Sequence, residues 1–110
     1  MSSTPILDGY KVIDFTQYLA GPTATRLMAE LGAEIIKVEM SPFGDPSRSF
    51  PYRSKEKRSA YFVQQNRGKK SLCIDIKNEK SKQVLADLIK ECDVLIENFA
   101  PGVIGRIGFS

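Results

Sequence analysis

Histidine and tryptophan are absent from this 110-residue sequence, and cysteine occurs only twice. Without histidine, the chain has neither the commonest general base nor the commonest catalytic metal ligand. This excludes His-dependent catalytic triads and the usual zinc-hydrolase sites. Proton transfer by these residues is restricted to carboxylates, lysine, tyrosine and cysteine, and we expect no metal site.

The two cysteines, Cys73 and Cys92, are too few for a disulfide scaffold, and each lies in an apolar run. We predict that both are small buried hydrophobic residues. No apolar stretch approaches the roughly 20 residues of a transmembrane helix, and the N-terminus lacks the basic start and apolar middle of a signal peptide. These absences favour a reducing, cytoplasmic location with no membrane partner.

Two phosphate-binding motifs are also missing. No G-x-G-x-x-G follows the first predicted strand, and G-x-x-x-x-G-K-[ST] occurs nowhere in the chain. The sequence therefore disfavours a dinucleotide-dependent dehydrogenase and a P-loop NTPase.

What is present is an ordinary globular composition, with 42% hydrophobic and 26% charged residues and a net charge of +3. Short apolar runs alternate with stretches of helical periodicity. Pro22 suits the first position of the first helix, Gly32 suits its end, and Asn78 suits the N-cap of the second. We predict four strands, at Lys11–Phe15, Ile35–Glu39, Ser71–Ile76 and Asp93–Glu97, with helices after the first and third and another starting at Pro101–Ile107.

This order predicts two β-α-β units in an α/β fold with an open parallel sheet and flanking helices. The near-continuous apolar run of the third strand is typical of a strand buried on both faces. Four strands cover such a sheet poorly, so we expect the chain to be an incomplete, N-terminal part of a larger fold.

A long connection from Ser41 to Lys70 separates the two units. Between Arg48 and Lys70 it carries eight basic residues and one acidic residue, a net charge of +7. Its Tyr61-Phe62-Val63 run suits a short helix or an extended piece. Such a segment fits a functional connection better than a second domain.

Ligands of open parallel sheets bind beyond the carboxyl ends of the strands, where loops and helix N-termini present free N–H groups. This rule selects Lys77, Asn98 and the backbone around Gly21 and Gly102, with Arg106 one turn into the last helix. The cations favour an anionic ligand. Ordinary solvated surface charges are the alternative for Lys77 and Arg106. We expect Asp14, inside the first strand, to be structural.

Seven motifs, in order, resemble the start of class III CoA-transferases, the family of formyl-CoA transferase, carnitine CoA-transferase and α-methylacyl-CoA racemase. The resemblance runs from about Leu7 to Phe109. The motifs are Asp14-Phe15-Thr16, Ala20-Gly21-Pro22, the run Leu31–Glu39, Gly44-Asp45-Pro46-x-Arg48, the run Asn66–Ser71, Asp75-Ile76-Lys77 and the run Glu97–Gly102.

The resemblance implies that residues 1–110 form the N-terminal part of a Rossmann-like domain that binds coenzyme A, in an interlocked homodimer acting on an acyl-CoA and a carboxylic acid. It implies that Lys77 and Arg106 meet phosphates, that Ile74 and Phe99 pack against the adenine or pantetheine, and that Asn98 fixes a polar group. The implied CoA contacts are Ile74, Lys77, Asn98, Phe99, Val103 and Arg106.

Three positions depart from the formyl-CoA transferase pattern. Met40 replaces an arginine that contacts a phosphate in that pattern. Arg48 or another residue of the basic connection would have to make this contact instead. Leu19 replaces a glutamine and Phe50 a tryptophan, which favours a bulkier or more apolar acyl group than formate or oxalate.

The resemblance implies a catalytic aspartate that forms mixed anhydrides and lies beyond Ser110, so we expect no catalytic residue here and no activity from these residues alone. One alternative is a racemase of the same family, which uses a histidine and an aspartate. The other is a non-enzymatic domain that binds anions or nucleic acid through the basic connection, although it has no RNP-like or recognition-helix motif. We expect no nucleic-acid partner.

Overall fold

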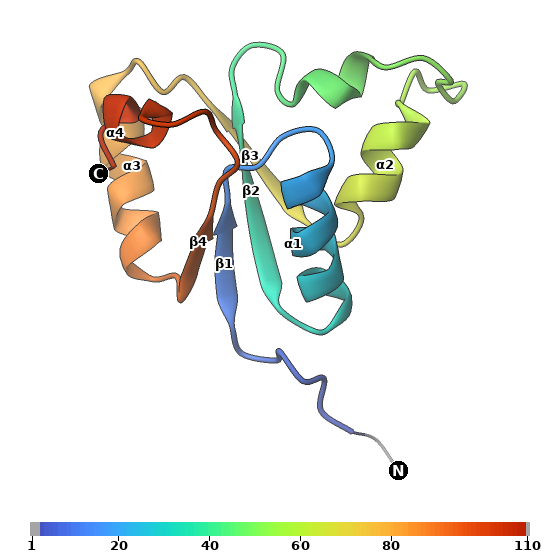
Figure 1. Ribbon diagram of the computed structural model, residues 1–110, viewed down its shortest axis with the longest axis horizontal. Coiled ribbons are helices and arrows are strands. Elements are labelled where there is room, and N and C mark those ends of the chain that lie inside the picture. Colours follow the sequence, from blue (N-terminus) through green and yellow to red (C-terminus); the bar gives the residue numbers. More distant parts are fainter. Residues whose placement is uncertain (1–2, 110) are drawn as a thin grey trace.

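Four parallel strands form one sheet in the computed structural model, which describes residues 3–109 (Figure 1). The strands are β1 (Lys11–Asp14), β2 (Glu34–Met40), β3 (Lys70–Ile74) and β4 (Val94–Ile96), and their order across the sheet is β3-β2-β1-β4. Both neighbours of β1 pair with it in parallel, and β3 pairs in parallel with β2. The predicted α/β fold with an open parallel sheet is confirmed.

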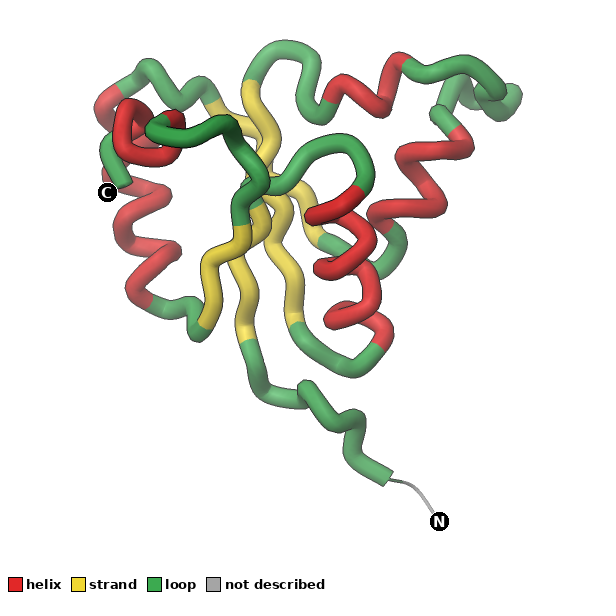
Figure 2. Tube along the Cα trace, viewed as in Figure 1, coloured by secondary structure: helices red, strands yellow, loops and turns green. Residues whose placement is uncertain are grey.

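Helices cover both faces of the sheet (Figure 2). The helices α1 (Ala20–Glu30) and α2 (Ala60–Asn66) lie on one side, and α3 (Glu79–Lys90) and α4 (Val103–Ile107) lie on the other. None of the helices within residues 3–109 is long and apolar enough to cross a membrane. The described residues also contain no group of three or more potential metal ligands of the Cys, Asp or Glu type.

The hydrophobic core is split by the sheet into two clusters, because successive side chains of a strand point to opposite faces. Ile13, Phe15 and Val38 pack with Leu85 of α3. On the other face, Val12 and Ile35 pack with Ala33, and partly buried Met28 and Ala29 of α1 lie against them. The α1 face becomes polar toward the carboxyl ends of the strands, where Asp14, Lys37 and Glu39 are buried.

Helix starts follow the sequence signals with one correction. Asn78 caps α3, as predicted, since its side chain accepts a hydrogen bond from Lys80 N at 2.8 Å. Pro22 is the third residue of α1 instead of the first, because the helix begins at Ala20. The first four N–H groups of a helix have no partner within it, so a proline is tolerated at the third position as well.

The prediction that the third strand is buried on both faces is wrong. The connection leads β3 to the outside of β2, so β3 is an edge strand, and Leu72 and Ile74 are only half-buried. For the same reason Cys73 is exposed, while Cys92 is half-buried between α3 and β4. The predicted burial of the two cysteines therefore fails for Cys73.

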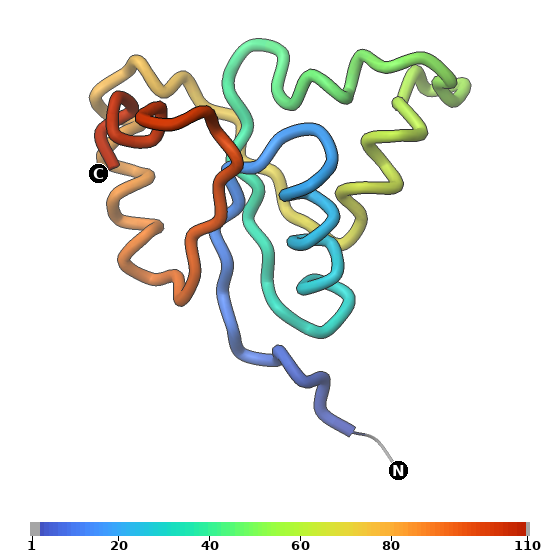
Figure 3. The backbone as a smooth tube through the Cα atoms, viewed as in Figure 1, coloured from blue at the N-terminus to red at the C-terminus, as the bar shows by residue number. Residues whose placement is uncertain are grey.

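The long connection leaves the carboxyl end of β2, runs outward on the α1 side of the sheet and returns through α2 to the start of β3 (Figure 3). It contains a 3-10 helix, η1 (Pro46–Ser49), and α2. The Tyr61-Phe62-Val63 run is helical, which is one of the two forms predicted for it. The Ser59 side chain caps this helix by accepting a hydrogen bond from Phe62 N. The connection is thus structured by local caps as well as by its contacts with the sheet.

Candidate functional site

The loops that follow the four strands meet at one edge of the sheet, because all four strands point the same way (Figure 3). Ile74 and Ile76 beside the third strand end and Phe99 after β4 pack against the same core cluster as Phe15. The loops that carry Lys77 and Asn98 therefore both contribute apolar residues to one core cluster. We call this end of the sheet, with the loop residues 15–19, 41–45, 75–78 and 97–102, the carboxyl rim.

Two of the six candidate CoA contacts are anchored in the core. Ile74 ends β3 and is half-buried, and the half-buried Phe99 ring lies 6.2 Å from the Phe15 ring. The Phe99 N–H donates to Glu97 Oε2 at 2.7 Å. These contacts fix the apolar side of the carboxyl rim without help from a ligand.

The cationic candidates are exposed. Lys77 lies in the turn before α3, where its N–H donates to Asp75 Oδ1 at 3.0 Å. Val103 begins α4, and Arg106 follows in the same short helix. The Arg106 guanidinium lies over Gly102, whose φ of 83° belongs to the left-handed region. Among the ion pairs of residues 3–109, none involves Lys77 or Arg106.

Asn98 joins two loops of the rim. Its Oδ1 accepts a hydrogen bond from Gln17 N at 2.9 Å, and its Nδ2 donates to Gln17 O at 2.9 Å. No local pattern indicated this partner, since the two residues are 81 positions apart. Asn98 therefore holds the loop after β1 as well as standing at a candidate ligand position.

Gly21 allows the first turn of α1 to approach the end of β1. A Cβ at this position would overlap the side chain of Thr16, which is fully buried and packed in place. The glycine of the Ala20-Gly21-Pro22 motif is thus needed for close approach rather than for an unusual backbone angle.

Gly21→Ala is expected to lower the free energy of unfolding by about 1–3 kcal/mol, because the added methyl group overpacks a site that cannot expand. Urea unfolding of the chain measures this change. Gly9→Ala is a control without steric overlap, since no atom lies within 4 Å of a Cβ there, and its cost is limited to the backbone strain of a φ of +88°. A Gly21→Ala chain as stable as the parent would contradict the close-approach role.

A buried carboxylate at the end of β1 organises the loop that follows it. Asp14 accepts hydrogen bonds from Thr16 N at 2.8 Å, from the Thr16 hydroxyl, and from Thr25 Oγ1 at 2.6 Å. Lys69 Nζ lies 3.0 Å from Asp14 Oδ2. Burial lowers the pKa of Lys69, and attraction to Asp14 opposes that shift. Asp14 is therefore a buried, paired carboxylate.

A second buried ion pair ties β2 to the loop beyond it. Lys37 Nζ lies 2.9 Å from Asp45 Oδ2 and donates to Thr16 O at 2.7 Å. Both side chains are almost completely inaccessible, at 1% and 0% exposure. Asp45 Oδ1 accepts from Ser47 N at 2.9 Å. Burial raises the pKa of Asp45, but the bonds from Lys37 and Ser47 outweigh it, so the pKa lies below its usual value.

The third pair uses both oxygens of Glu39. Arg48 Nε and Nη2 donate to Glu39 Oε1 and Oε2, each at 2.7 Å, in a bidentate arrangement. Asp45 N and the Ser71 hydroxyl donate to the same carboxylate. Burial raises the pKa of Glu39, but hydrogen bonds from Arg48, the Asp45 N–H and Ser71 lower it to about 2.

Sequence reasoning missed the partners of these three buried carboxylates. Their signal was the alternation of Lys37 and Glu39 with apolar residues in β2, which places two charges on the covered α1 face. It also missed the role of Arg48, whose guanidinium stacks 3.8 Å above the Phe62 ring. Arg48 is a structural residue of the connection here. The structure gives no support to its taking over the phosphate-binding role of the arginine that Met40 replaces.

The basic connection is less available to a polyanion than its composition indicates. Four of its eight basic residues form ion pairs within the fold, namely Arg48, Arg67, Lys69 and Lys70. An open hollow of about 540 Å³ beside α2 is lined in part by Arg53, Arg58 and Arg67. Its lining includes none of the six candidate CoA contacts.

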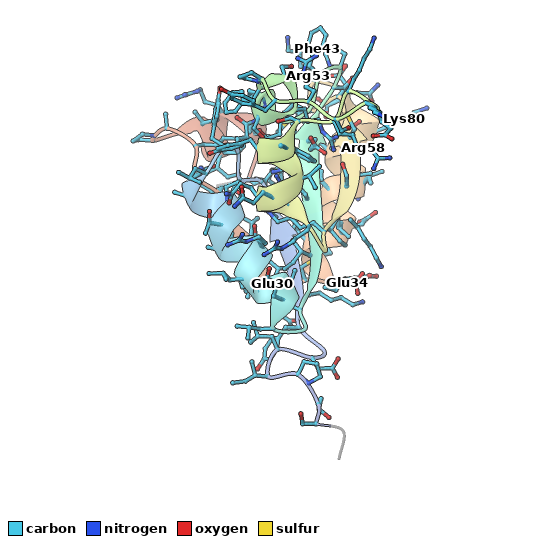
Figure 4. The ribbon with its side chains drawn as sticks, turned by 90° about the vertical axis from the view of Figure 1, so that its right-hand side faces the viewer. Glu30, Glu34, Phe43, Arg53, Arg58 and Lys80 are labelled. Atoms are coloured by element: carbon cyan, nitrogen blue, oxygen red, sulfur yellow. The ribbon has the colours of Figure 1, made fainter. Side chains whose placement is uncertain are left out.

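Charged side chains lie at both ends of the sheet (Figure 4). Arg53, Arg58 and Lys80 lie toward the upper end in this view, which is the end of the carboxyl rim, and Glu30 and Glu34 lie toward the opposite end. Glu30 and Glu34 pair with Arg67 and Lys70 at that lower end.

Comparisons with known proteins agree with this geometry. The family model described as CoA-transferase family III matches residues 7–110. A formyl-CoA:oxalate CoA-transferase of Rhodopseudomonas palustris (strain BisA53) is 48% identical over 106 residues, which cover 96% of this chain and 25% of the relative. The same-named enzyme of Bradyrhizobium sp. (strain ORS 278) is 47% identical, with the same coverage. The chain thus spans about a quarter of the length of these relatives.

Solved structures give the same result. A hypothetical protein of Mycobacterium tuberculosis, Rv3272, superposes with a TM-score of 0.88 at 39% identity, covering 99% of this chain and 29% of that protein. A CAIB/BAIF family protein of Brucella suis has a TM-score of 0.88 at 38% identity, and the match covers 98% of this chain and 29% of that protein. The four-stranded arrangement therefore occurs as part of larger proteins.

Proposed function

Because this chain belongs to CoA-transferase family III, we propose that it is the N-terminal, CoA-binding part of an enzyme that moves CoA between carboxylic acids. In this proposal the whole enzyme acts as an interlocked homodimer in the cytoplasm. The observation that supports the proposal is that the loops after all four strands lie at one end of the sheet, where the exposed Lys77 follows β3 and the core-anchored Phe99 follows β4. Arg106, also exposed, lies in α4, the helix after the loop that carries Phe99.

The donors at the rim suit the chemistry of coenzyme A. Its phosphates require cations or N–H groups, which Lys77 and Arg106 supply without breaking an ion pair of residues 3–109. Its adenine and pantetheine require an apolar wall, which Ile74, Phe99 and Val103 provide. Asn98 keeps one N–H and one lone pair beyond its two bonds to Gln17, so it can still meet a polar group of the ligand.

The reaction itself needs a carboxylate that this part of the protein does not supply. In the proposed enzyme, an aspartate outside residues 1–110 attacks the acyl-CoA carbonyl, which forms a mixed anhydride and releases the CoA thiolate. The acceptor carboxylate then attacks the aspartyl carbonyl of the anhydride and displaces the donor carboxylate, which leaves. The thiolate finally attacks the acceptor carbonyl of the new anhydride, which forms the product thioester and frees the aspartate. We propose that residues 1–110 bind and orient CoA but do not catalyse transfer alone, and that Leu19 and Phe50 favour a bulkier or more apolar acyl group than formate.

Titration with coenzyme A tests the binding site, in a full-length protein that carries this chain at its N-terminus. Lys77→Ala and Arg106→Ala are each expected to weaken CoA binding by roughly tenfold, which corresponds to removing an interaction of about 1.4 kcal/mol. Lys90→Ala is the matched control, because Lys90 ends α3 and lies roughly 16 Å from its start at 1.5 Å per residue.

Unchanged affinity in both variants would remove the assignment of the site, and a full-length protein that does not bind CoA would remove the proposed function. Transfer of CoA to a carboxylic acid, without proton exchange at the α-carbon of a 2-methylacyl-CoA, separates the proposed transferase from a racemase.

A further inference from the structure

The hydrogen bonds between Asn98 and Gln17 extend the pairing of β1 with β4 beyond the ends of both strands. The backbone ladder joins Asp14 to Ile96, and Phe15 N then donates to Ile96 O at 2.8 Å. Beyond this bond, the Asn98 side-chain amide takes the place of a backbone amide in the ladder. It accepts a hydrogen bond from Gln17 N and donates one to Gln17 O. The loop after β1 is thereby held to the loop after β4.

The residue after Gln17 has an unusual backbone conformation. Tyr18 has a φ of 68°, in the left-handed region that bulky residues rarely adopt. Its N–H lies 3.5 Å from Asp45 Oδ1, and its ring packs 6.0 Å from the Phe50 ring. A residue strained in this way keeps its conformation only when its surroundings hold it there.

Successive residues of the loop are fixed by different elements. Thr16 is held by Asp14 from β1 and Lys37 from β2, and Gln17 is held by Asn98. The loop leads directly into α1, whose N-cap residue makes no side-chain capping bond. The shape of this part of the rim therefore depends on the contacts of the loop residues Thr16, Gln17 and Tyr18.

We propose that Asn98 is a positioning residue, which locks the Thr16–Leu19 loop and the first turn of α1 in place at the carboxyl rim before CoA binds. The inference rests on the proposed CoA site and assigns Asn98 a role that it plays in the free protein. A loop that is already ordered loses little further entropy when the ligand arrives. Removal of the lock therefore weakens binding even where every direct interaction with the ligand is kept.

Amide hydrogen exchange of the full-length protein without CoA tests the positioning role directly. In Asn98→Ala, exchange at Gln17 and Tyr18 is expected to accelerate by about tenfold or more, because Gln17 N–H loses its acceptor. Asn98→Asp keeps an acceptor for Gln17 N–H but faces the Gln17 carbonyl with a carboxylate oxygen, so a smaller acceleration is expected. Urea unfolding of each variant separates this local opening from a global loss of stability.

Asn78→Ala is the matched control. Asn78 makes the same kind of side-chain bond, to Lys80 N at 2.8 Å, but this bond caps α3 and involves no residue of the Thr16–Leu19 loop. Exchange in this variant is expected to change at the start of α3 and to stay unchanged at Gln17 and Tyr18.

A CoA titration of the full-length protein completes the test, with an expected loss of about tenfold in affinity for Asn98→Ala. Weaker CoA binding with unchanged exchange at Gln17 and Tyr18 would overturn the positioning role and leave Asn98 as a ligand contact alone. A parent protein that does not bind CoA would overturn the proposed function, while the exchange result would still decide whether Asn98 holds the loop.

Discussion

Replacing Lys37 by methionine is expected to lower the free energy of unfolding by about 3–5 kcal/mol, because it leaves a buried carboxylate without its counter-charge. Asp45 Oδ2 lies 2.9 Å from Lys37 Nζ and accepts no hydrogen bond from any other described residue. The Thr16 carbonyl loses its Lys37 donor in the same variant. Urea unfolding at neutral pH, followed by circular dichroism, measures the loss.

Lys70→Met is the matched control. It makes the same substitution in an ion pair with Glu34 whose side chains are 74% and 40% exposed. Water and salt screen such a pair, so the expected cost is below about 1 kcal/mol. Equal costs for Lys37→Met and Lys70→Met would contradict the role of the buried pair.

A double variant provides a second stability measurement of the same ion pair if Lys37→Met is too unstable to measure. Lys37→Met with Asp45→Asn removes the uncompensated charge and keeps most of the shape of the side chain. It is expected to be at least about 1 kcal/mol more stable than Lys37→Met alone. A double variant less stable than the single variant would show that the two side chains do not act as a pair.

Acid is expected to destabilise the protein by up to about 3 kcal/mol through Glu39 alone, because each unit of pKa shift corresponds to about 1.4 kcal/mol. The pKa of Glu39 is lowered from 4.5 to about 2 in the folded protein. The unfolded chain therefore binds a proton first as the pH falls. The stabilisation is complete above pH 4.5, where the unfolded carboxyl is ionised, and it disappears as the pH falls toward 2. The lowered pKa of Asp45 acts in the same direction.

Urea midpoints between about pH 7 and pH 3 test this dependence. Glu39→Gln is expected to be less stable than the parent at neutral pH and to show a shallower loss of stability below pH 4.5, since one shifted carboxyl is gone. Glu30→Gln is the control, because Glu30 pairs with Arg67 at the surface, where the two side chains are 41% and 59% exposed. A Glu39→Gln chain with the parent's pH dependence would contradict the proposed linkage.

These ion pairs bear on the proposed CoA site because of where they lie. Lys37, Glu39 and Asp45 lie under the carboxyl rim, and each is bonded to a loop that leaves a strand end. Replacing one partner is therefore expected to disturb the rim as well as the core. The motifs that resemble the family thus include residues that hold the strand-end loops through hydrogen bonds and ion pairs.

Local signals were sufficient for the elements of the fold. The alternation of short apolar runs with helical periodicity predicted four strands in β-α-β order, and the capping residue Asn78 marked the start of α3. The strand-end rule then selected the edge where Lys77 and Asn98 lie. Such signals work because periodicity and capping depend on neighbours within one or two turns of the chain.

Placement across the sheet was not predictable in the same way. β3 is an edge strand, and Cys73 is exposed, because the connection passes outside β2. An apolar run alone cannot distinguish an edge strand that is covered on one side from a central strand covered on both. The predicted position of Pro22 was wrong for a smaller reason, since several N-terminal helix positions lack an internal hydrogen-bond partner and all of them accept proline.

The amino-acid order alone was enough to establish the α/β class, the succession of strands along the chain and the residues that stand after each strand. The folded arrangement was needed to show which charges are buried together and that the Asn98 side chain is bonded to Gln17. Such contacts join residues that are far apart in the chain, as with Asn98 and Gln17 at a separation of 81 positions. Their partners are therefore chosen by the packing of whole elements, which no local pattern of residues records.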